Sequence, residues 1–386
     1  MKIPVLDLKP QIQAHRAEIM AAIESVIDNT RFVLGPEVTE LERAVSAYTG
    51  SKHAVGVASG SDALLIALMA LGIGGADAVI TTPYTFFATV GAICRVGAIP
   101  IFVDIRPDSL NIDAGLVEKC LTERCEPDAA AGVLRDRISG RLVRAIIPVH
   151  LFGQCADMDA IMALAQRHKL FVIEDAAQAL GARCNGARAG SIGHIGCLSF
   201  YPTKNLGGFG DGGMLTTSDD SLAEHCRILR VHGSKPKYYH SRVGVNSRLD
   251  SIQAAALLVG LKHLDEWTRM RREHARTYTE SLKDTHGVVP PAVLPNQHHV
   301  FNQYVIRSNN RDALRRFLAE REIGAEIYYP LPLHLQECFS QFGYKKGNFP
   351  ESERAAEESL AIPMFPYLTV EQRTTVTNAI KEFHKK

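Results

Sequence analysis

The chain has 386 residues, of which 46% are hydrophobic and 22% are charged, and its formal net charge is +1. This length suits two domains, and the composition is that of an ordinary globular protein. The near-neutral charge excludes a global field that would attract nucleic acid or an acidic membrane. The eight cysteines form no C-x-x-C pair, which argues against a zinc knuckle or a secreted disulfide framework and predicts buried thiols in a reducing cytoplasm.

Short apolar, β-branched segments alternate with helical patterns through the first two thirds of the chain. This alternation predicts a mostly parallel mixed sheet with helices on both faces, and one further strand at 212–220 that is antiparallel. The longest apolar stretch contains Pro83 and predicts a strand followed by a helix, not a membrane span. The other predicted strands are 53–59, 77–83, 99–105, 144–150, 170–175 and 196–202, and the clearest helices are 61–73 and 157–169.

The pattern changes near residue 260, where a long charged helix is predicted over 261–284. Its apolar residues recur on one stripe, as expected of a helix that packs on one side. Beyond it, a strand at 301–308 and helices at 311–324 and 370–383 predict a smaller C-terminal α+β domain. The residues of the stripe are Leu261, Leu264, Trp267 and Met270.

These segments predict a large domain over 1–260, which includes the N-terminal segment, and a small domain over 261–386 that the long helix joins to it. The polar segment 122–141 has no strong periodicity and is expected to be a surface insertion. The N-terminal residues lack the apolar core of a signal peptide.

The stretch "SFYPTKNLGGFGDGG" (199–213) has two competing interpretations. Residues 208–213 match the dinucleotide-binding pattern G-x-G-x-x-G, which requires a helix after the glycines and an acidic residue about 20 positions further on. The following "MLTTSDD" has β character, and no such acidic residue is present. The favoured interpretation is that the glycines let a cofactor approach Lys204, which would be a Schiff-base lysine.

A Schiff-base lysine implies pyridoxal phosphate (PLP), which needs a carboxylate at its ring nitrogen, a stacking partner and a phosphate cradle. Glu174 and Asp175 end the strand predicted at 170–175. Because side chains alternate across a strand, only one of the two carboxylates can face a cofactor. The alternative for the aspartate is a helix cap.

A phosphate cradle is predicted where a strand passes through Ser59, Gly60 and Ser61 into a helix. The free N–H groups of that helix start and the two hydroxyls suit a phosphate, although a simple N-cap has the same sequence. Phe86 and Phe87 follow another strand, and either can stack on a pyridine ring or belong to the core. Together, these signals indicate a PLP site at the ends of the strands.

The motifs "EDAAQ" (174–178), "SFYPTKNLGGFGDGGM" (199–214) and "NSRLDSIQAA" (246–255) closely resemble the DegT/DnrJ/EryC1/StrS family of sugar aminotransferases, and the likeness spans nearly the whole chain. The resemblance implies an α/β protein of PLP-dependent transferase fold type I (aspartate aminotransferase-like), with active sites shared across a homodimer. It assigns Lys204 as the Schiff-base lysine. It assigns cofactor contacts to Gly60, Ser61, Phe86, Asp175, Gln178, Ser199 and Asn246.

By the same resemblance, Asp175 faces the pyridine nitrogen, Gln178 lies beside the ring hydroxyl and Phe86 stacks on the ring. Asn246 reaches the phosphate from the other subunit. A lysine at 204, where some dehydratases of the family carry histidine, favours transamination. The expected reaction moves an amino group from L-glutamate to a keto sugar linked to a nucleotide, with Lys204 as both Schiff-base partner and acid/base.

Substrate contacts are expected from two further segments, "HGSKPKYYHSRVGVNSRLD" and "YYPLPLH". The form "YYH…GVNSRLD" resembles the subgroup that acts at C3 of nucleotide-linked 3-keto sugars, including hexuluronates, although C4 enzymes share most of these motifs. Arg248 has the alternative of holding its own loop. The candidates are Lys237, Tyr238, Tyr239, His240, Arg248, Tyr329 and His334, and no metal site is expected.

Two other functions remain open on the sequence alone. A PLP-dependent sugar dehydratase would need a redox partner, and its iron–sulfur relatives would need a cysteine cluster that the sequence does not provide. A non-catalytic PLP-binding regulator is disfavoured by the intact set of Lys204, Asp175 and Gln178. No basic arm or helix-turn-helix pattern supports DNA binding.

Overall fold

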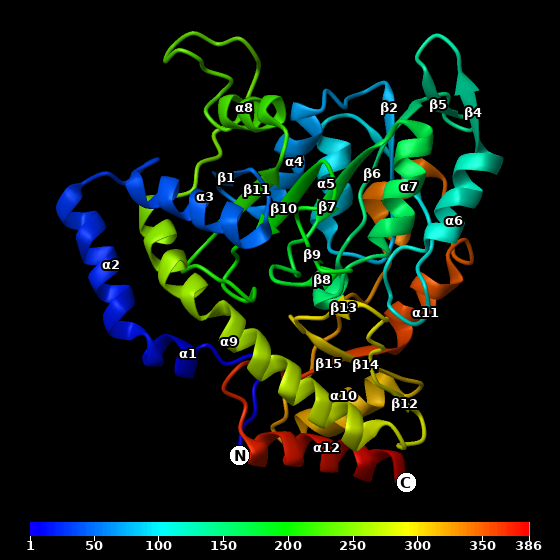
Figure 1. Cartoon of the computed structure of the whole chain (residues 1–386). Helices are drawn as coiled ribbons and strands as arrows, with labels where there is room; N and C mark the ends of the chain where they lie inside the picture. The colour runs from blue at the N-terminus through cyan, green and yellow to red at the C-terminus, as the bar shows by residue number, and fades with distance from the viewer. Residues whose placement is uncertain (386) are drawn as a thin grey trace.

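The computed structural model describes residues 1–385 and is built around a nine-stranded mixed sheet (Figure 1). The main path runs β1-β11-β10-β7-β6-β2-β3, in which β11 is antiparallel to both of its neighbours and the remaining pairs are parallel. The antiparallel strand predicted at 212–220 is thus confirmed. The strands are β1 (His53–Val57), β2 (Asp77–Thr81), β3 (Ile99–Phe102), β6 (Leu142–Ile146), β7 (Phe171–Asp175), β10 (Ile195–Ser199) and β11 (Gly213–Thr217).

Both faces of this sheet are buried because helices cover each of them, and successive strand residues point alternately to the two faces. Ala78 and Ile80 of β2 belong to one hydrophobic cluster, whereas Val79 between them belongs to the other. Helices α3, α7 and the start of α9 cover the first cluster, and α4, α5 and α8 cover the second. Their bounds are α3 (Pro36–Thr49), α4 (Gly60–Ala70), α5 (Phe87–Arg95), α7 (Met158–His168), α8 (Asp220–Leu229) and α9 (Ser251–Leu282).

Helix α9 runs from the sheet into a smaller α+β unit, near which both chain termini lie (Figure 1). That unit contains a three-stranded antiparallel sheet in the order β12-β14-β15. Tyr278 and Leu282 of α9 share its core with Ile306 and Val376. The elements are β12 (Val288–Val289), β14 (Tyr304–Ser308), β15 (Ser359–Ile362), α10 (Arg311–Ala319), α11 (Pro350–Glu358) and α12 (Val370–Lys385), with 3₁₀ turns at Leu333–Leu335 and Glu337–Phe342.

The predicted domain boundary between residues 260 and 261 falls inside this one continuous helix. The first turns of α9 are buried on several sides, so they lack the one-sided stripe from which the helix was predicted to begin at 261. The N-terminal segment also contacts both units. After α1 (Lys9–Ala14), α2 (Arg16–Asn29) lies along α9 (Figure 1), while Ile3 packs in the small core and bridges Ile323.

The segment 122–141, which was expected to be a surface insertion, contains a β-hairpin. After α6 (Ala114–Lys119) and a π-turn at Cys120–Arg124, β4 (Cys125–Asp128) pairs with β5 (Val133–Asp136), which joins the sheet through β6. Arg124 donates to the buried Asp136 carboxylate at 2.7 Å.

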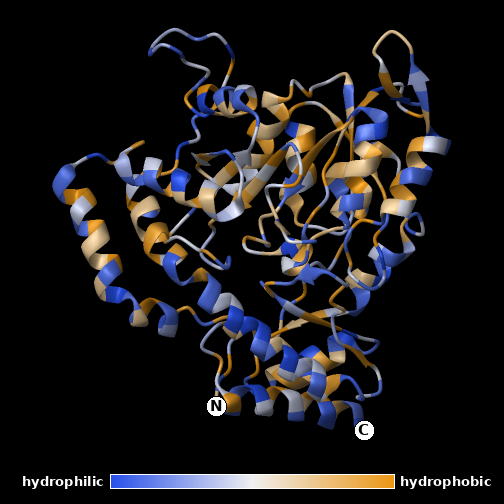
Figure 2. Cartoon of the chain, viewed as in Figure 1, coloured by the Kyte–Doolittle hydropathy of each residue, from blue (hydrophilic) through white to orange (hydrophobic). Residues whose placement is uncertain are grey.

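Three shorter strands, β8 (Arg183–Cys184), β9 (Ala187–Arg188) and β13 (Gln297–His298), form a separate small sheet, and a 3₁₀ turn covers Leu151–Gly153. Hydrophobic residues gather on the central strands, whereas α2 and α9 carry both hydrophobic and hydrophilic residues along their length (Figure 2). Within residues 1–385, no helix combines the length and the apolar composition that a bilayer crossing requires. The eight cysteines are all unpaired.

Candidate active site

A cavity of about 580 Å³ opens where β7 and β10 end and α4 begins. Ligands of open α/β sheets bind at the carboxyl ends of parallel strands, and this volume suits a small-molecule site. The cavity brings together residues that lie far apart in the sequence. Its lining includes the predicted residues Gly60, Ser61, Phe86, Asp175, Gln178, Ser199, Lys204 and Tyr329.

Asp175 is the last residue of β7 and is only 5% exposed. The Thr89 hydroxyl donates to its Oδ2 at 2.7 Å, and the Ala177 N–H donates to its Oδ1 at 3.3 Å. Burial raises the pKa of Asp175, while these two donors and the charge of Lys204 act in the opposite direction. The result is a deep carboxylate that is ready to pair with a cationic ring nitrogen.

Glu174 points to the other side of β7, as strand alternation requires, and its contacts are structural. Its carboxylate accepts from the backbone N–H groups of Gly190, Ile192 and Gly193 at 2.6–2.8 Å. His150 lies 2.9 Å from it through Nε2, and its Nδ1 accepts from the Ala156 N–H, so Nε2 carries the proton. Of the two carboxylates, only Asp175 is therefore available to a ligand.

Lys204 lies in the turn after β10, where its backbone N–H donates to the Tyr201 carbonyl at 2.8 Å. Its side chain lines the cavity and is partly buried. Burial lowers the pKa of the Lys204 amine, and the negative charge of Asp175 offsets part of this effect. A lowered pKa increases the fraction of neutral amine, which is the form that can attack a carbonyl or accept a proton.

The start of α4 forms a close-fitting cradle against β10 and β11. Ser59 caps the helix by accepting from the Asp62 N–H at 3.1 Å, which leaves earlier N–H groups of the helix free. A Cβ on Gly60 would lie 2.7 Å from Ser199 Cβ, and a Cβ on Gly213 would lie 2.4 Å from the Ser59 carbonyl group. Only glycine allows this approach, so N–H groups and hydroxyls converge as a phosphate requires.

Gln178 and Tyr329 join the large unit to the small one at the cavity. The Phe152 N–H donates to Gln178 Oε1 at 2.6 Å, and Gln178 Nε2 donates to the Tyr329 hydroxyl at 3.1 Å. The Phe86 ring is 56% exposed, and its centroid lies 5.9 Å from that of Tyr329. This arrangement leaves one face of Phe86 open for a planar ligand. The amine, the carboxylate, the cradle and the aromatic ring together fit PLP.

Thr89 is the residue of this site that sequence reasoning missed. It lies on α5, two residues after Phe87, and is fully buried. A threonine in an apolar helix gives no sign of its partner in the sequence, because the contact with Asp175 joins residues 86 positions apart.

Several predicted substrate residues do not line the cavity of this chain. Lys237, Tyr238, Tyr239 and His240 lie in the exposed loop after α8, where Tyr239 is 71% exposed. Asn246 is also exposed, and it bridges Val231 at the base of that loop.

The neighbouring Ser247 anchors the chain next to Asn246 and Arg248. Its hydroxyl donates to Asp62 Oδ2 at 2.7 Å and accepts from the Ala58 N–H at 3.0 Å. The loop therefore ends beside α4, and the residues at its tip lie outside the cavity of their own chain.

His334 is not a cavity residue, which corrects its predicted role as a substrate contact. Its side chain is buried, and its Nε2 lies 3.0 Å from Glu353 Oε1. The rings of Phe102 and Phe349 pack around it. The Leu333–Leu335 turn directs it into the protein, whereas Tyr329 of the same segment faces the cavity.

The order of strands and the position of the cavity define the chain as a PLP-dependent transferase of fold type I. Residues 13–381 match the model of the DegT/DnrJ/EryC1/StrS aminotransferase family, and the chain belongs to that family. The fold class, the family and the PLP cofactor expected from the sequence are thereby confirmed.

Named relatives are similar over nearly their whole length. A pleiotropic regulatory protein of Geobacillus stearothermophilus is 51% identical, covering 100% of this chain and 99% of the relative. A dTDP-3-amino-3,4,6-trideoxy-α-D-glucose transaminase of Streptomyces venezuelae is 41% identical, covering 99% and 96%. A UDP-N-acetyl-3-dehydro-α-D-glucosamine 3-aminotransferase of Acidithiobacillus ferrooxidans is 42% identical, covering 98% and 97%.

Among solved structures, that of S. venezuelae DesV in complex with a ketimine intermediate superimposes with a TM-score of 0.93 and 41% sequence identity. The match covers 100% of this chain and 99% of that one. Relatives named as nucleotide-sugar transaminases and this structural match identify the chain as an aminotransferase of amino-sugar formation.

Proposed function

We propose that the protein transfers the amino group of L-glutamate to a nucleotide-linked keto sugar, giving 2-oxoglutarate and an amino sugar. The observation that carries the proposal is the convergence of Lys204, the buried Asp175 and the α4 cradle on one cavity. Segments that lie far apart in the sequence supply the amine, the carboxylate and the phosphate site that the chemistry needs.

In this proposal, Asp175 pairs with the ring nitrogen of PLP, Gln178 lies beside the ring hydroxyl and Phe86 stacks on the ring. Gly60, Ser61 and Ser199 hold the phosphate with the start of α4. When bound, PLP supplies an electron sink for the negative charge that develops at the amino donor's α-carbon. Asp175 supports this role because its carboxylate, held by Thr89, keeps the ring nitrogen protonated.

Lys204 has two roles in the proposed cycle. Its Nζ would hold PLP in the resting enzyme, and as a free amine it would move a proton between the donor α-carbon and C4′ of the cofactor. A partly buried amine of lowered pKa is suited to this base role. The second half-reaction repeats these proton transfers in reverse with the keto sugar.

The keto sugar is proposed to be a 3-keto rather than a 4-keto sugar. The names of relatives that are 41% and 42% identical to the chain refer to position 3, with dTDP in one and UDP in the other. These names support the class of sugar and leave the nucleotide open. The product would enter a glycan, such as lipopolysaccharide, or a glycosylated metabolite.

Two copies of the chain are proposed to share each active site. Phe86 and Tyr201 line the cavity yet are 56% and 51% exposed, which marks a surface suited to a partner. Asn246 would reach the phosphate from the second subunit, and Lys237, Tyr239 and Arg248 would contact the nucleotide sugar beside Tyr329. The unpaired cysteines support a reducing compartment, so we propose a cytoplasmic enzyme.

A non-catalytic regulator is the second candidate, since the relative at 51% identity is named a pleiotropic regulatory protein. The test is to incubate the PLP-loaded protein with ¹⁵N-labelled L-glutamate and dTDP- or UDP-linked 3-keto and 4-keto sugars. Mass spectrometry should find the label in an amino sugar, with the 3-keto substrates preferred. A protein that labels none of them and forms no 2-oxoglutarate would be a regulator or a dehydratase.

A further inference from the structure

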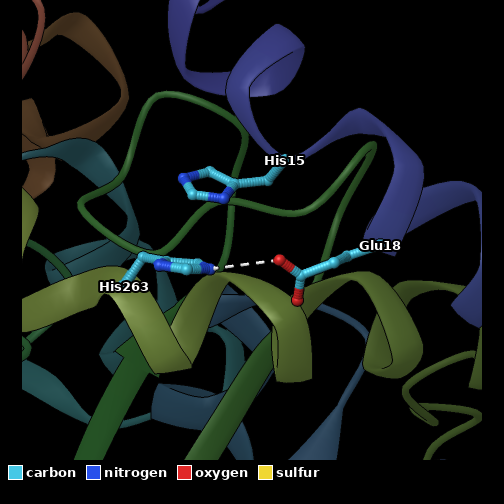
Figure 3. Close-up of side chains that lie close together, drawn as sticks. All are labelled: His15, Glu18 and His263. Carbon is cyan, nitrogen blue, oxygen red and sulfur yellow. Dashed lines mark ion pairs between the residues drawn. The ribbon is translucent and has the colours of Figure 1, made fainter.

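A cluster of two histidines and one glutamate lies outside the cavity lining, at the place where the N-terminal segment meets α9 (Figure 3). His15 separates α1 from α2, Glu18 lies in the first turn of α2, and His263 projects from α9. One ligand atom from each of the three residues lies within 4.8 Å of the others. Nothing in the proposed transamination uses these residues.

The two histidines have nitrogens that no hydrogen bond satisfies within residues 1–385. The Nε2 atoms of His15 and His263 are both shielded from solvent and without a hydrogen-bond partner. His263 Nε2 lies 3.9 Å from Glu18 Oε1, too far for a hydrogen bond (Figure 3). Unsatisfied buried nitrogens are uncommon in folded proteins, and coordination to an ion would satisfy both of these.

We propose that His15, Glu18 and His263 bind a divalent transition-metal ion of the Zn²⁺ class, with solvent in the remaining coordination position. Imidazole nitrogen and carboxylate oxygen are ligands that Zn²⁺ accepts, and sites with three protein ligands and one open position are common. Glu18 is on the exposed side of the cluster, which gives the ion a path of entry.

Coordination of one ion requires the three side chains to move closer together. Tetrahedral coordination with bonds of about 2.0–2.2 Å places neighbouring ligand atoms roughly 3.3–3.5 Å apart, so the 3.9 Å separation of His263 and Glu18 needs to shrink by about half an ångström. The two imidazole rings stack at 3.7 Å with an angle of 23°. At least one ring has to turn for both nitrogens to face one ion.

Burial favours the neutral form of His15, and a lysine competes with the ion for Glu18. Burial, and next to it the charge of His263, lowers the pKa of His15, while Glu18 and Glu266 act in the opposite direction. Lys262 Nζ lies 3.6 Å from Glu18 Oε2, so this lysine has to release the carboxylate when the ion binds.

The bound ion would fasten the N-terminal segment to α9, which serves both cores of the protein. The chain carries its own reporter, because its single tryptophan, Trp267, lies beside both histidines. The ring centroids are 5.7 Å from His15 and 5.9 Å from His263. A metal at this site should therefore change the fluorescence of Trp267.

The experiment uses untagged, PLP-loaded protein, since a histidine tag would bind the same ions. Zn²⁺ is titrated by calorimetry at neutral pH, and Cu²⁺ is titrated by quenching of Trp267. Glu18→Gln and His263→Ala remove one ligand each, whereas Glu266→Gln removes an exposed carboxylate on α9 that is outside the cluster. Glu18 is exposed, so its variant should fold even if His263→Ala does not.

In the wild type and in Glu266→Gln, we expect one Zn²⁺ to bind per chain and the melting temperature to rise when Zn²⁺ is present. In both proteins, Cu²⁺ should quench the fluorescence of Trp267. Loss of a ligand in Glu18→Gln should weaken binding by at least about tenfold. The proposal is overturned if Zn²⁺ does not bind to the wild type, or if Glu18→Gln binds it as tightly as Glu266→Gln does. Quenching that persists unchanged in Glu18→Gln would also overturn it.

Discussion

The hydrogen bond from Thr89 to Asp175 should set the pH at which the enzyme begins to lose activity on the acid side. Thr89→Val keeps the shape of the side chain but removes the donor 2.7 Å from Asp175 Oδ2. The hydroxyl stabilises the charged carboxylate, so its removal favours the protonated form and raises the pKa of Asp175 further.

The size of the effect follows from the burial of both groups. A hydrogen bond to a charged group contributes about 1.5–3 kcal/mol, and a pKa difference of one corresponds to ~1.36 kcal/mol. The pKa of Asp175 should therefore rise by about 1 to 2, and the acid limb of the rate profile should move to higher pH by the same amount. The PLP ring nitrogen loses its charged partner over that range.

The assay is the single-turnover rate of the L-glutamate half-reaction, measured against pH in the wild type and the variant. Thr85→Val is the matched control, because the Thr85 hydroxyl lies 3.1 Å from the Thr89 hydroxyl, one step further from the carboxylate. Its acid limb should stay near that of the wild type. If Thr89→Val and Thr85→Val give the same profile, Thr89 does not tune Asp175 and the reasoning is refuted.

Three further predictions concern the cavity and its surroundings. Asp175→Asn should raise the melting temperature of the cofactor-free protein at neutral pH, because burial raises the pKa of this carboxyl and makes its charged form costly; calorimetry should show the gain vanishing below the unfolded-state pKa of ~3.9. In a PLP titration, Gly60→Ala should bind the cofactor about tenfold more weakly or worse. Gly74→Ala should bind PLP as the wild type does, because the nearest neighbour of its Cβ would lie 3.7 Å away. His334→Ala should cost about 1–3 kcal/mol of stability with an unchanged KM for the keto sugar, since His334 bonds Glu353 outside the cavity; a raised KM at unchanged stability would contradict this placement.

The sequence predicted those parts of the fold that local patterns determine. Buried strands ending in polar residues predicted the sheet and the edge at which Asp175 and Lys204 meet. The start of α9 at Ser251 was not predicted, because residues 251–260 are buried on several sides and carry no amphipathic stripe. The hairpin at 125–136 was not predicted either. Pairing between its two strands and the Arg124–Asp136 bond stabilise it, and these contacts leave no apolar alternation in the sequence.

The candidate site divides in the same way. Residues in contiguous motifs, such as Asp175 and Gln178, were predicted from the motif itself and line the cavity. Thr89 and His334 depend on contacts across the fold, one with Asp175 and the other with Glu353. Neither partner can be inferred from sequence spacing. Thr89 was therefore missed, and His334 was wrongly predicted to contact the substrate.

The most direct test of the central claim is a visible absorbance scan of the PLP-loaded protein during addition of L-glutamate, with Lys204→Ala in parallel. The account predicts that the band of lysine-bound PLP disappears in the wild type as an equal amount of 2-oxoglutarate forms, and that Lys204→Ala never has this band. A band that ignores L-glutamate and other amino donors would contradict the aminotransferase function. A band that persists in Lys204→Ala would contradict the assignment of the lysine.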